Sequence, residues 1–330
     1  MLMVKGMKKT IINSIIITTK NRVEHLERCL YSLNASGYFE RPTVEILVVD
    51  NSLGDFEVET ICRKWGARYV NEPRAGKSAA QNLGIMKSLG SVLTFTDDDV
   101  IINDHNWINK INEKLNRHQN LGYLSGNVIA MEKTSLAQKM WEKKGGLSKG
   151  TQSIYLINAD IINSKNVWPL TKFCAGANCT ILKKVFEQIG GYCELLGPGA
   201  MIGHGESIEI GYRIIRAGFD VAYDKDIVVT HNHPSDVISI KRKLFLYGVG
   251  DTALYFHLFL SFRDTKCLYW SLIGHPLYSL NKIIKRVNGK YSLPIDYVLY
   301  SIAGSLSGSW VYLYRRIKLK LLSKNHIGVA

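Results

Sequence analysis

Short apolar runs alternate with amphipathic segments along the first third of the chain. The run from Ile11 to Thr19 is rich in β-branched residues, as buried strands are, whereas the segment from Val23 to Leu33 repeats apolar residues at helical spacing. Further segments continue this alternation. The predicted order is strand 11–19, helix 23–33, strand 44–49, helix 58–65, strand 67–70, helix 78–89 and strand 92–96.

An alternation of strands and helices at such short intervals predicts an α/β fold with a doubly wound, mostly parallel sheet. In such a sheet, ligands bind in a crevice at the carboxyl ends of the strands. Residues that directly follow the predicted strands are therefore the first candidates for chemistry. Between residues 100 and 172 the pattern weakens into mixed helix and loop, and residues 143–150 have the composition of a flexible basic loop.

The most polar strand end carries three consecutive aspartates, Asp97, Asp98 and Asp99. They follow the apolar run 92–96, and unpaired carboxylates are too costly to bury in a packed core, so these acids belong at the edge of the sheet. Clustered carboxylates at that edge suit a hard divalent cation that also binds phosphate oxygens. A solvated acidic turn is the alternative for the triplet taken alone.

Two other strand ends are expected at the same edge. TTKNR at 18–22 follows the first strand and DNS at 50–52 follows the second, although both are also ordinary turn compositions. Before the third helix, Arg74, Gly76 and Lys77 form an arrangement able to hold phosphate at a helix start. This segment is not a P-loop, because the GxxxxGKS/T spacing is absent.

Composition and charge narrow the class of protein. Of the 330 residues, 46% are hydrophobic and 21% are charged, which is typical of a folded chain and not of a disordered one. The formal net charge of +14 predicts an anionic partner, for which nucleic acid, anionic lipid and nucleotide phosphates are the candidates. The six cysteines show neither a CxxC pair nor zinc-site spacing, so reduced thiols in the cytosol are expected.

Nine segments, taken in their order and spacing, resemble family 2 glycosyltransferases, whose nucleotide-sugar-binding fold is called GT-A. The resemblance runs through residues 10–250, and no single segment decides it. The segments are IIITTKNR (15–22), LERCLYSL (26–33), EILVVDNS (45–52), GKSAAQNLG (76–84), TFTDDDV (94–100), AGANCTILKK (175–184), IGGYCELLGPG (189–199), GESIEIGYRIIRAGFDVAYD (205–224) and VVTHNHP (228–234).

The resemblance implies a set of residues that bind the donor. Thr18 and Asp50 match positions that contact the nucleobase, with Arg22 nearby. Asp97 and Asp98 match the sugar and ribose side of the DxD-type motif. Together with the segment able to hold phosphate, the predicted donor-binding set is Thr18, Arg22, Asp50, Asn51, Lys77, Asp97 and Asp98.

The resemblance also implies a divalent metal cofactor, Mn²⁺ or Mg²⁺. Asp99 matches the metal ligand of the DxD-type motif, and His231 matches a histidine that approaches the metal and the diphosphate in related enzymes. Neutral imidazole is a common metal ligand, although a histidine in such a place can also be a packing residue. His233 is the second candidate in the same segment.

The predicted catalytic base departs from the family pattern. Family 2 enzymes usually supply it from a Glu-Asp pair just before a helix, and here that pair reads Glu206 and Ser207. Serine cannot act as a base without an activator, so Glu206 is the first candidate and Glu209 the second. Glu209 and Arg213 are four residues apart on the predicted helix, a spacing that favours an ion pair and a structural role for Glu209.

The predicted organisation has three parts: a basic tail at 1–9, a GT-A catalytic domain at 10–236 and a helical, basic extension at 237–330. Within the catalytic domain, residues 10–100 are the nucleotide-binding half and residues 101–236 the acceptor-binding half. The first apolar run is short, is broken by polar residues and has no cleavage site. We therefore interpret it as a strand and not as a secretory signal.

The extension contains a candidate for membrane contact. Residues 295–314 are about long enough to cross a bilayer, but Asp296 and four serines lower their hydrophobicity. A helix in the membrane interface, a helix packed on the catalytic domain and a spanning helix all fit this segment. With the basic residues that follow it, the interfacial form predicts a cytoplasmic protein held on the inner face of the cell membrane by anionic lipid.

The expected activity is metal-dependent transfer of a sugar from a nucleotide-diphospho-sugar to a saccharide or lipid-linked acceptor, in the synthesis of cell-surface polysaccharide or glycolipid. The resemblance implies inversion of the anomeric centre and favours UDP over GDP and dTDP. One alternative is a nucleotidyltransferase, but no Gly-rich loop follows the first strand. Another is a catalytically decayed binding protein. A nucleic-acid-binding protein is disfavoured, because no common module signature is present.

Overall fold

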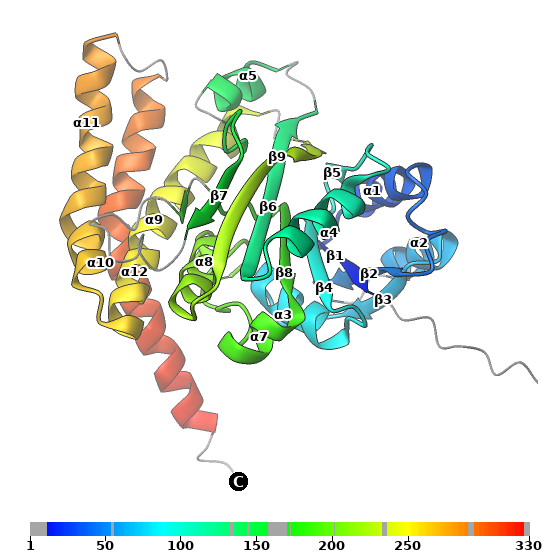
Figure 1. Ribbon diagram of the computed structural model, residues 1–330. Coiled ribbons are helices and arrows are strands. Elements are labelled where there is room, and N and C mark those ends of the chain that lie inside the picture. Colours follow the sequence, from blue (N-terminus) through cyan, green and yellow to red (C-terminus); the bar gives the residue numbers. More distant parts are fainter. Residues whose placement is uncertain are drawn as a thin grey trace, which may run out of the picture.

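The computed structural model describes residues 12–53, 56–131, 135–143, 146–157, 170–171, 173–200, 202–232, 236–289 and 294–326. The predicted basic tail at 1–9 and the candidate ligand His233 lie outside these residues. One nine-stranded sheet with flanking helices forms the centre of the molecule (Figure 1), with strand order β3-β2-β1-β4-β8-β6-β9-β5 and with β7 paired to β9.

The strands are β1 (Asn13–Thr19), β2 (Val44–Asp50), β3 (Arg68–Asn71), β4 (Val92–Asp97), β5 (Val100–Ile101), β6 (Leu121–Ala130), β7 (Ile154–Ile157), β8 (Asn178–Leu182) and β9 (Asp220–His231). The helices up to residue 216 are α1 (Val23–Ala35), α2 (Phe56–Trp65), α3 (Lys77–Lys87), α4 (Trp107–Arg117), α5 (Leu136–Lys143), α7 (Lys183–Ile189) and α8 (Glu206–Arg216). The helices that follow are α9 (Val237–Phe262), α10 (Thr265–Tyr269), the π-helical turn η2 (Trp270–Gly274), α11 (His275–Val287) and α12 (Ile295–His326).

The first half of the sheet is parallel, as its alternating pattern predicts. β3, β2, β1 and β4 are neighbours in that order and all run in the same direction. Every element predicted between residues 11 and 96 is present, with ends that differ by two residues or fewer. Apolar side chains alternate between the two faces, since Ile16 joins one buried cluster and Ile15 and Ile17 join the other. Both faces of the sheet are therefore covered.

The second half of the sheet is mixed and differs from the pattern. β8 runs antiparallel to both β4 and β6, whereas β9 runs parallel to β6. The ten-residue strand β6 lies where the sequence indicated only mixed helix and loop. Its apolar pattern is broken by Gly122 and Gly126, where a Cβ would collide with Phe219 and with Asn178 respectively. Close approach of neighbouring segments therefore explains why this strand reads poorly from sequence.

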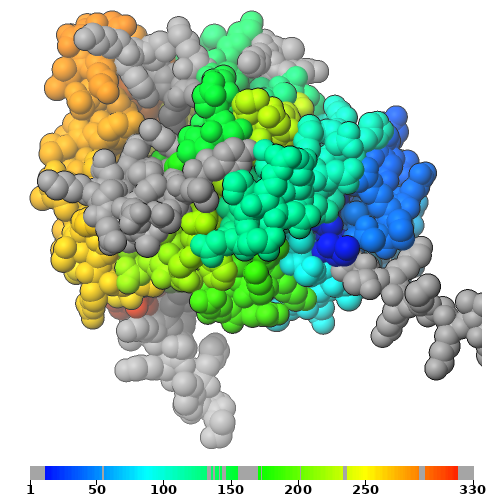
Figure 2. Space-filling model, viewed as in Figure 1, coloured from blue at the N-terminus to red at the C-terminus, as the bar shows by residue number. Residues whose placement is uncertain are grey.

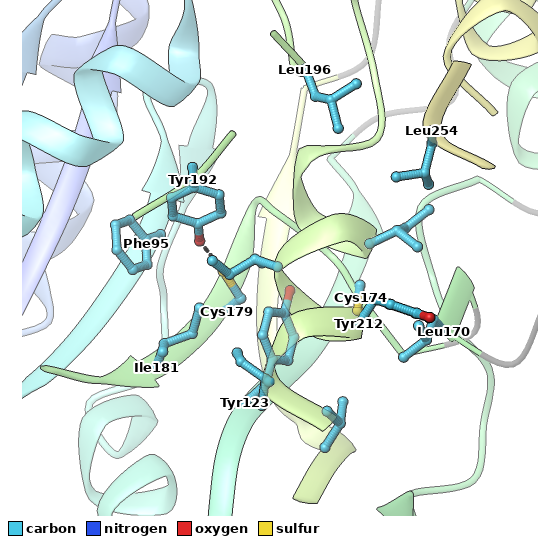
Figure 3. Packing of buried hydrophobic residues seen from close by; sticks show 14 of the residues in the cluster. Phe95, Tyr123, Leu170, Cys174, Cys179, Ile181, Tyr192, Leu196, Tyr212 and Leu254 are labelled. Carbon is cyan, nitrogen blue, oxygen red and sulfur yellow. Dashed lines mark hydrogen bonds between the residues drawn. The ribbon is translucent and has the colours of Figure 1, made fainter. Parts of the chain in front are cut away.

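Aromatic side chains fill the core on the face of the sheet that carries α3, α7 and α8. Phe95 of β4 meets Tyr192 edge to face, with ring centroids 5.5 Å apart (Figure 3). The Tyr192 hydroxyl lies 4.0 Å from the Cys179 sulfur, the contact drawn as a dashed line. Leu254 of α9 and Tyr312 of α12 belong to this same buried cluster. The C-terminal helices thus complete this core, and they also bury a small cluster of their own, formed by Ile240, Leu244 and Tyr297.

Small residues bring α9 and α12 into close contact. A Cβ at Gly304 would collide with the backbone oxygen of Phe245, and a Cβ at Gly248 would collide with the backbone of Ser301. Serine hydroxyls link the neighbouring helices, with the Ser279 and Ser305 oxygens 2.9 Å apart. The predicted segment 295–314 is therefore helical and packs on α9, and the division of the chain between residues 236 and 237 stays a prediction.

We expect Gly304→Ala to lower the midpoint of thermal unfolding, measured by scanning calorimetry. The new methyl group meets a backbone carbonyl that cannot rotate away, and overpacking of this kind costs about 1–3 kcal/mol. That cost outweighs the gain of ~1 kcal/mol in helix propensity of Ala over Gly. Gly203→Ala is the matched control, because its Cβ would make only ordinary contacts with Leu246, the nearest at 3.6 Å. Equal midpoints for both variants would contradict the close packing of α9 on α12.

Candidate active site

Strand register gathers the predicted site residues at one edge of the sheet. Thr18 at the end of β1 pairs with Asp97 at the end of β4, and the next residue, Thr19, pairs with Asp50 of β2. A cleft opens at this edge. Its lining residues are Thr18, Thr19, Lys20, Arg22, Asn51, Lys77, Asp97, Pro198 and Gly199.

Five of the seven predicted donor-binding residues line this cleft: Thr18, Arg22, Asn51, Lys77 and Asp97. Lys77 begins α3 and forms an ion pair with Asp97. Burial disfavours the charged form of Asp97, but the Lys77 ammonium outweighs this effect, so the pKa of Asp97 is lowered. Burial likewise disfavours the charged form of Lys77, but the Asp97 carboxylate outweighs it, so the pKa of Lys77 is raised. Both side chains are therefore charged, and they meet at the floor of a cleft at the carboxyl edge of the sheet.

Asp98 does not line the cleft, although it was predicted among the donor-binding residues. Its carboxylate is fully buried, accepts a hydrogen bond of 2.7 Å from the Thr19 hydroxyl and forms an ion pair with Arg22. Burial raises the pKa of Asp98 to about 7, against the opposing effect of the Arg22 guanidinium. In this structure Asp98 holds Arg22 in place, and its contact with a donor stays a prediction.

Arg22 also binds Asp99, with 2.8 Å between Nη1 and Oδ2. Burial disfavours charge on the guanidinium, but the carboxylates of Asp99 and Asp98 raise the pKa of Arg22. The preceding residue, Asn21, has φ +54°, a left-handed conformation that asparagine tolerates better than most residues. This turn aims Arg22 back at the two aspartates.

Asp50 and Asn51 act on the loops around the cleft. The Asp50 carboxylate is fully buried and accepts a hydrogen bond of 2.9 Å from the Ser52 amide and one of 3.2 Å from the Tyr69 hydroxyl. The Asn51 amide donates to the backbone oxygens of Glu72 and Arg74 and accepts from Gly76 N. The predicted contact of Asp50 with a nucleobase stays a prediction.

Asp97, Asp99 and His231 form a group that can hold a metal ion. One ligand atom of each lies within 4.8 Å of those of the other two. Antiparallel pairing of Val100 in β5 with His231 at the end of β9 brings the histidine to Asp99. The buried Asp99 Oδ1 lies 3.2 Å from His231 Nε2 and yet accepts no hydrogen bond among the described residues. Carboxylate and imidazole ligands with a carboxylate oxygen left over fit a divalent cation.

Glu206 lies directly behind the wall of the cleft. It begins α8 after Gly205, whose φ of +107° few other residues adopt, and its side chain is buried. A Cβ at Gly197 would lie 3.2 Å from Glu206 Cγ, and the next two residues, Pro198 and Gly199, line the cleft. Oε1 is 3.2 Å from the Ser207 hydroxyl, and Oε2 accepts no hydrogen bond among the described residues.

Glu209, the second candidate base, is engaged elsewhere. Its two carboxylate oxygens accept hydrogen bonds of 2.7 and 2.9 Å from Arg213, the predicted pair four residues along the helix. Arg213 in turn donates to the backbone oxygens of Ile189 and Gly191. Burial raises the pKa of Glu209, but His257 and Arg213 outweigh it and lower this pKa. Glu209 thus fastens α8 to the loop after α7.

Helix α9 supports the segment that carries Glu206. His204 stacks on Tyr247, with ring centroids 4.4 Å apart, and its Nε2 lies 3.6 Å from the Asp251 carboxylate. Asp251 also lies 3.2 Å from His275. Burial alone would raise the pKa of Asp251, but the two imidazoles lower it well below its usual range.

Two residues at the site were not among the predicted donor-binding residues. Thr19 holds Asp98, and its signal was only its place at the end of the first strand. Lys243 of α9 is the other, and burial lowers its pKa while the Asp99 carboxylate counteracts this. No motif marks Lys243, because it lies on α9 and not at the end of a strand.

A family model described as "Glycosyl transferase family 2" matches residues 14–190, which is more than half of the chain. The chain belongs to glycosyltransferase family 2. The matched range includes the parallel half of the sheet and the three aspartates, and it ends before Glu206 and His231. Family membership thus confirms the resemblance seen in the sequence, and it favours sugar transfer over nucleotidyl transfer.

Curated relatives match shorter stretches. The glycosyltransferase AglE of Haloferax volcanii is 35% identical over 92 residues, which cover 26% of this chain and 30% of the relative. The glycosyltransferase GlyA of Streptococcus pneumoniae serotype 4 is 28% identical over 111 residues, which cover 32% of this chain and 15% of the relative. The chain therefore spans less than a third of the length of these relatives.

A solved structure with a similar fold is the mannosyltransferase PcManGT from Pyrobaculum calidifontis, in complex with GDP-Man and Mn²⁺. Its TM-score is 0.60 at 14% identity, and the match covers 90% of this chain and 87% of that one. The predicted GT-A fold with C-terminal helices is thereby confirmed, since the match extends beyond the catalytic part.

We expect Asp99→Ala to weaken Mn²⁺ binding, measured by the electron paramagnetic resonance signal of free Mn²⁺. The loss should exceed roughly 10–100-fold, the cost of removing residues that merely orient a metal ligand. Asp226→Ala removes an exposed acid elsewhere and should leave binding unchanged. Equal affinity in both variants would rule out Asp99 as a ligand.

We expect Asp251→Asn to lower the midpoint of thermal unfolding most between about pH 4 and pH 6.5, the usual pKa values of Asp and His. The pKa of Asp251 is lower in the folded protein than in the unfolded chain, so Asp251 stabilises the fold at pH values above its unfolded pKa. This contribution is lost as the pH falls through the folded pKa. Burial lowers the pKa of His204, but Asp251 outweighs it and raises this pKa. His204 therefore stabilises the fold at pH values below its unfolded pKa, and this contribution is lost as the pH rises through the folded pKa.

The matched control is Asp296→Asn, which removes an exposed ion pair with Lys241 in the same group of helices. Its midpoint should differ from the wild type by a similar, small amount at every pH above 5. A deficit of Asp251→Asn that stays constant across the whole pH range would show that the histidine pairs do not stabilise the fold.

Proposed function

We propose that this protein transfers a sugar from a nucleotide-diphospho-sugar to an acceptor hydroxyl, with a divalent metal ion at Asp99 and His231 and with Glu206 as the base. The observation that carries the proposal is a pair of carboxylate oxygens on residues next to those that line the cleft: Asp99 follows Asp97 and Asp98, and Glu206 packs against Gly197, beside Pro198. Asp99 Oδ1 and Glu206 Oε2 are buried and accept no hydrogen bonds among the described residues. Family membership supplies the reaction class.

The charges at the cleft suit a diphosphate. Among the described residues, Asp97, Asp98 and Asp99 form ion pairs with Arg22 and Lys77, and Lys243 interacts electrostatically with Asp99. A bound Mn²⁺ or Mg²⁺ supplies Lewis-acid stabilisation of the charge that develops on the leaving diphosphate. Arg22 and Lys77 are placed to orient the phosphate oxygens through charge-assisted hydrogen bonds. The Mn²⁺ in the PcManGT complex supports this choice of metal.

We assign the nucleotide moiety to the end of the cleft formed by Thr18 and Asn51. Both residues line it, and the buried Asp50 holds the turn at Asn51 by accepting a hydrogen bond from the Ser52 amide. UDP is the donor nucleotide we favour, with GDP and dTDP as the alternatives. The GDP-Man bound to PcManGT keeps GDP among them.

The base must take a proton from the acceptor hydroxyl as that oxygen attacks the anomeric carbon. Glu206 suits this role, because it stands at the N-terminus of α8, where the helix dipole favours the ionised form. One of its oxygens is held by Ser207 and the other is left to accept the proton. The assignment makes Ser207 an orienting residue, and Glu209 a structural one. A single displacement of this kind inverts the anomeric centre.

We extend the proposal to the acceptor and the place of work. The acceptor is a saccharide or lipid-linked saccharide of cell-surface polysaccharide or glycolipid synthesis, reached at the inner face of the cell membrane. The large excess of basic residues and the apolar C-terminal helices support an anionic membrane surface as partner.

The first test is calorimetric titration of the full chain with UDP, GDP and dTDP, with and without Mn²⁺. We expect one nucleotide to bind more tightly with Mn²⁺, and this gain to vanish in Asp99→Ala while Asp226→Ala retains it. Absence of nucleotide binding under every condition would overturn the proposal.

We expect Glu206→Gln to lower the rate of sugar transfer by about 10²–10⁴-fold, the usual contribution of a general base. Binding of the donor nucleotide should be unchanged, because the amide keeps the shape of the carboxylate. Transfer is measured as release of nucleotide diphosphate in the presence of acceptor. The conservative control is Ser207→Ala, for which we expect a smaller loss. Full activity of Glu206→Gln would exclude Glu206 as the base, and nucleotide binding without transfer in the wild type would indicate a decayed binding protein.

A further inference from the structure

Exposed apolar side chains are concentrated on the C-terminal helices. Among the described residues, 25 large apolar side chains are exposed, and 15 of them lie between Tyr269 and Ile317. Figure 2 shows α11 and the residues before it, coloured yellow to orange, at the end of the molecule opposite the blue N-terminal half. A solvent-exposed group of this many apolar side chains marks an interaction site.

On each helix most of the exposed residues fall on one stripe, and Tyr278 and Tyr300 lie off it. On α12 the stripe residues are three, four or seven residues apart, on the side that faces away from Gly304 and Gly308, the residues that contact α9. On α11 and the turn before it, the stripe lies away from Ser279, which contacts α12. We call the two stripes together the apolar flank. Its residues are Ile273, Leu277, Leu280, Ile284 and Val287, with Leu299, Leu306, Trp310, Tyr314 and Ile317.

The apolar flank is accompanied by positive charge. Between residues 265 and 330 the sequence has ten lysines and arginines and one acidic residue, Asp296. That acid is already paired with Lys241, 2.6 Å away. Lys285 near the end of α11 and Lys318 on α12 are exposed beside the two stripes. Apolar stripes with basic residues at their ends are typical of helices that lie in a membrane interface.

We propose that the apolar flank docks on the surface of an anionic lipid bilayer, with the two helices lying in the interface. This inference deepens the membrane location proposed above and rests on it. It assigns the contact to α11 and α12 together, whereas the sequence pointed to residues 295–314 alone. Trp310 and Tyr314 insert at the headgroup level, where amphipathic aromatic rings partition, and the basic residues contact the lipid phosphates.

A spanning arrangement does not fit the packing of these helices. By length and composition, α9 is the one helix among the described residues able to cross a membrane, with a mean hydropathy of 1.2. However, 56% of that window is buried inside the protein, where α9 covers the catalytic core and contacts α12. The apolar character of α9 is therefore used within the fold, and the exposed stripes of α11 and α12 are left for lipid.

Charge decides between lipid and a second copy of the chain. A dimer formed through this flank would bring two strongly basic surfaces together, and like charges across an interface oppose association. An anionic bilayer is complementary to the same surface and attracts each basic residue near it. The lipid surface is therefore the occupant that the flank fits best.

The experiment is flotation of the full chain with vesicles of phosphatidylcholine alone and of phosphatidylcholine with phosphatidylglycerol. We expect binding to the anionic vesicles and much weaker binding to the neutral ones. Trp310→Ser with Tyr314→Ser should weaken partition into anionic vesicles by about tenfold or more, because each change removes a large apolar side chain that the bilayer would otherwise bury. Leu53→Ser with Phe56→Ser is the matched control, since both side chains are exposed and lie outside the flank.

Charge variants test the second part of the inference. Lys285→Gln with Lys318→Gln should weaken binding to anionic vesicles and reduce its dependence on salt, whereas Lys87→Gln with Lys184→Gln, exposed lysines elsewhere, should not. Equal binding to both vesicle types, no binding to either, or equal loss in the controls would each overturn the proposal. So would a dimer, seen by analytical ultracentrifugation, that dissociates in the Trp310 and Tyr314 variant.

Nucleotide binding is measured on the same protein samples, which keeps this inference separate from the proposed reaction. Vesicle binding with no nucleotide binding would leave the docking surface standing and reject sugar transfer. Nucleotide binding with no vesicle binding would reject the docking surface alone. Unchanged nucleotide affinity in the Trp310 and Tyr314 variant also shows that this variant is folded.

Discussion

The ion pairs of Arg22 with Asp98 and Asp99 are the constraint on which the cleft depends. Asp98 is fully buried at the end of β4, where a lone carboxylate would be strongly destabilising. Arg22 and Thr19 make its burial tolerable. Asp98 and Asp99 form the turn that follows β4, and with Asp98 held inward, Asp97 pairs with Lys77 and Asp99 lies beside His231. The directions of Asp97, which faces Lys77, and of Asp99, which faces His231, thus depend on Asp98, which faces the interior.

Sequence alone predicted the frame of this arrangement well. The alternation of short strands and helices is local, and it identified the parallel half of the sheet and the edge where three strand ends meet. The pairing of Asp99 with His231 was also expected from the resemblance, and the two side chains do lie together. Such successes come from patterns within one element or from an ordered set of motifs.

What the sequence could not supply depends on contacts between distant segments. Which of the three aspartates turns inward is decided by Arg22, which is 76 residues away from Asp98 along the chain. The antiparallel pairing of β4 with β8 joins Thr94 to Thr180, which are 86 residues apart, so no local pattern marks it. Residues 295–314 read as moderately apolar because averaging over the segment mixes two faces. On α12 the small residues pack against α9 and the large apolar residues face solvent. Only the packing of the helices distinguishes these two faces.

The shared core of the catalytic part and the C-terminal helices limits how this protein can be released or shortened. Leu254, Leu258 and Tyr312 belong to the same buried cluster as Phe95 and Tyr123, and Gly205 next to Glu206 rests against Leu254. Proteolytic cleavage after β9 would therefore not free a working catalytic domain from an anchor. It would remove the side chains that α9 and α12 contribute to the core, and with them the contact of Leu254 with Gly205, next to Glu206.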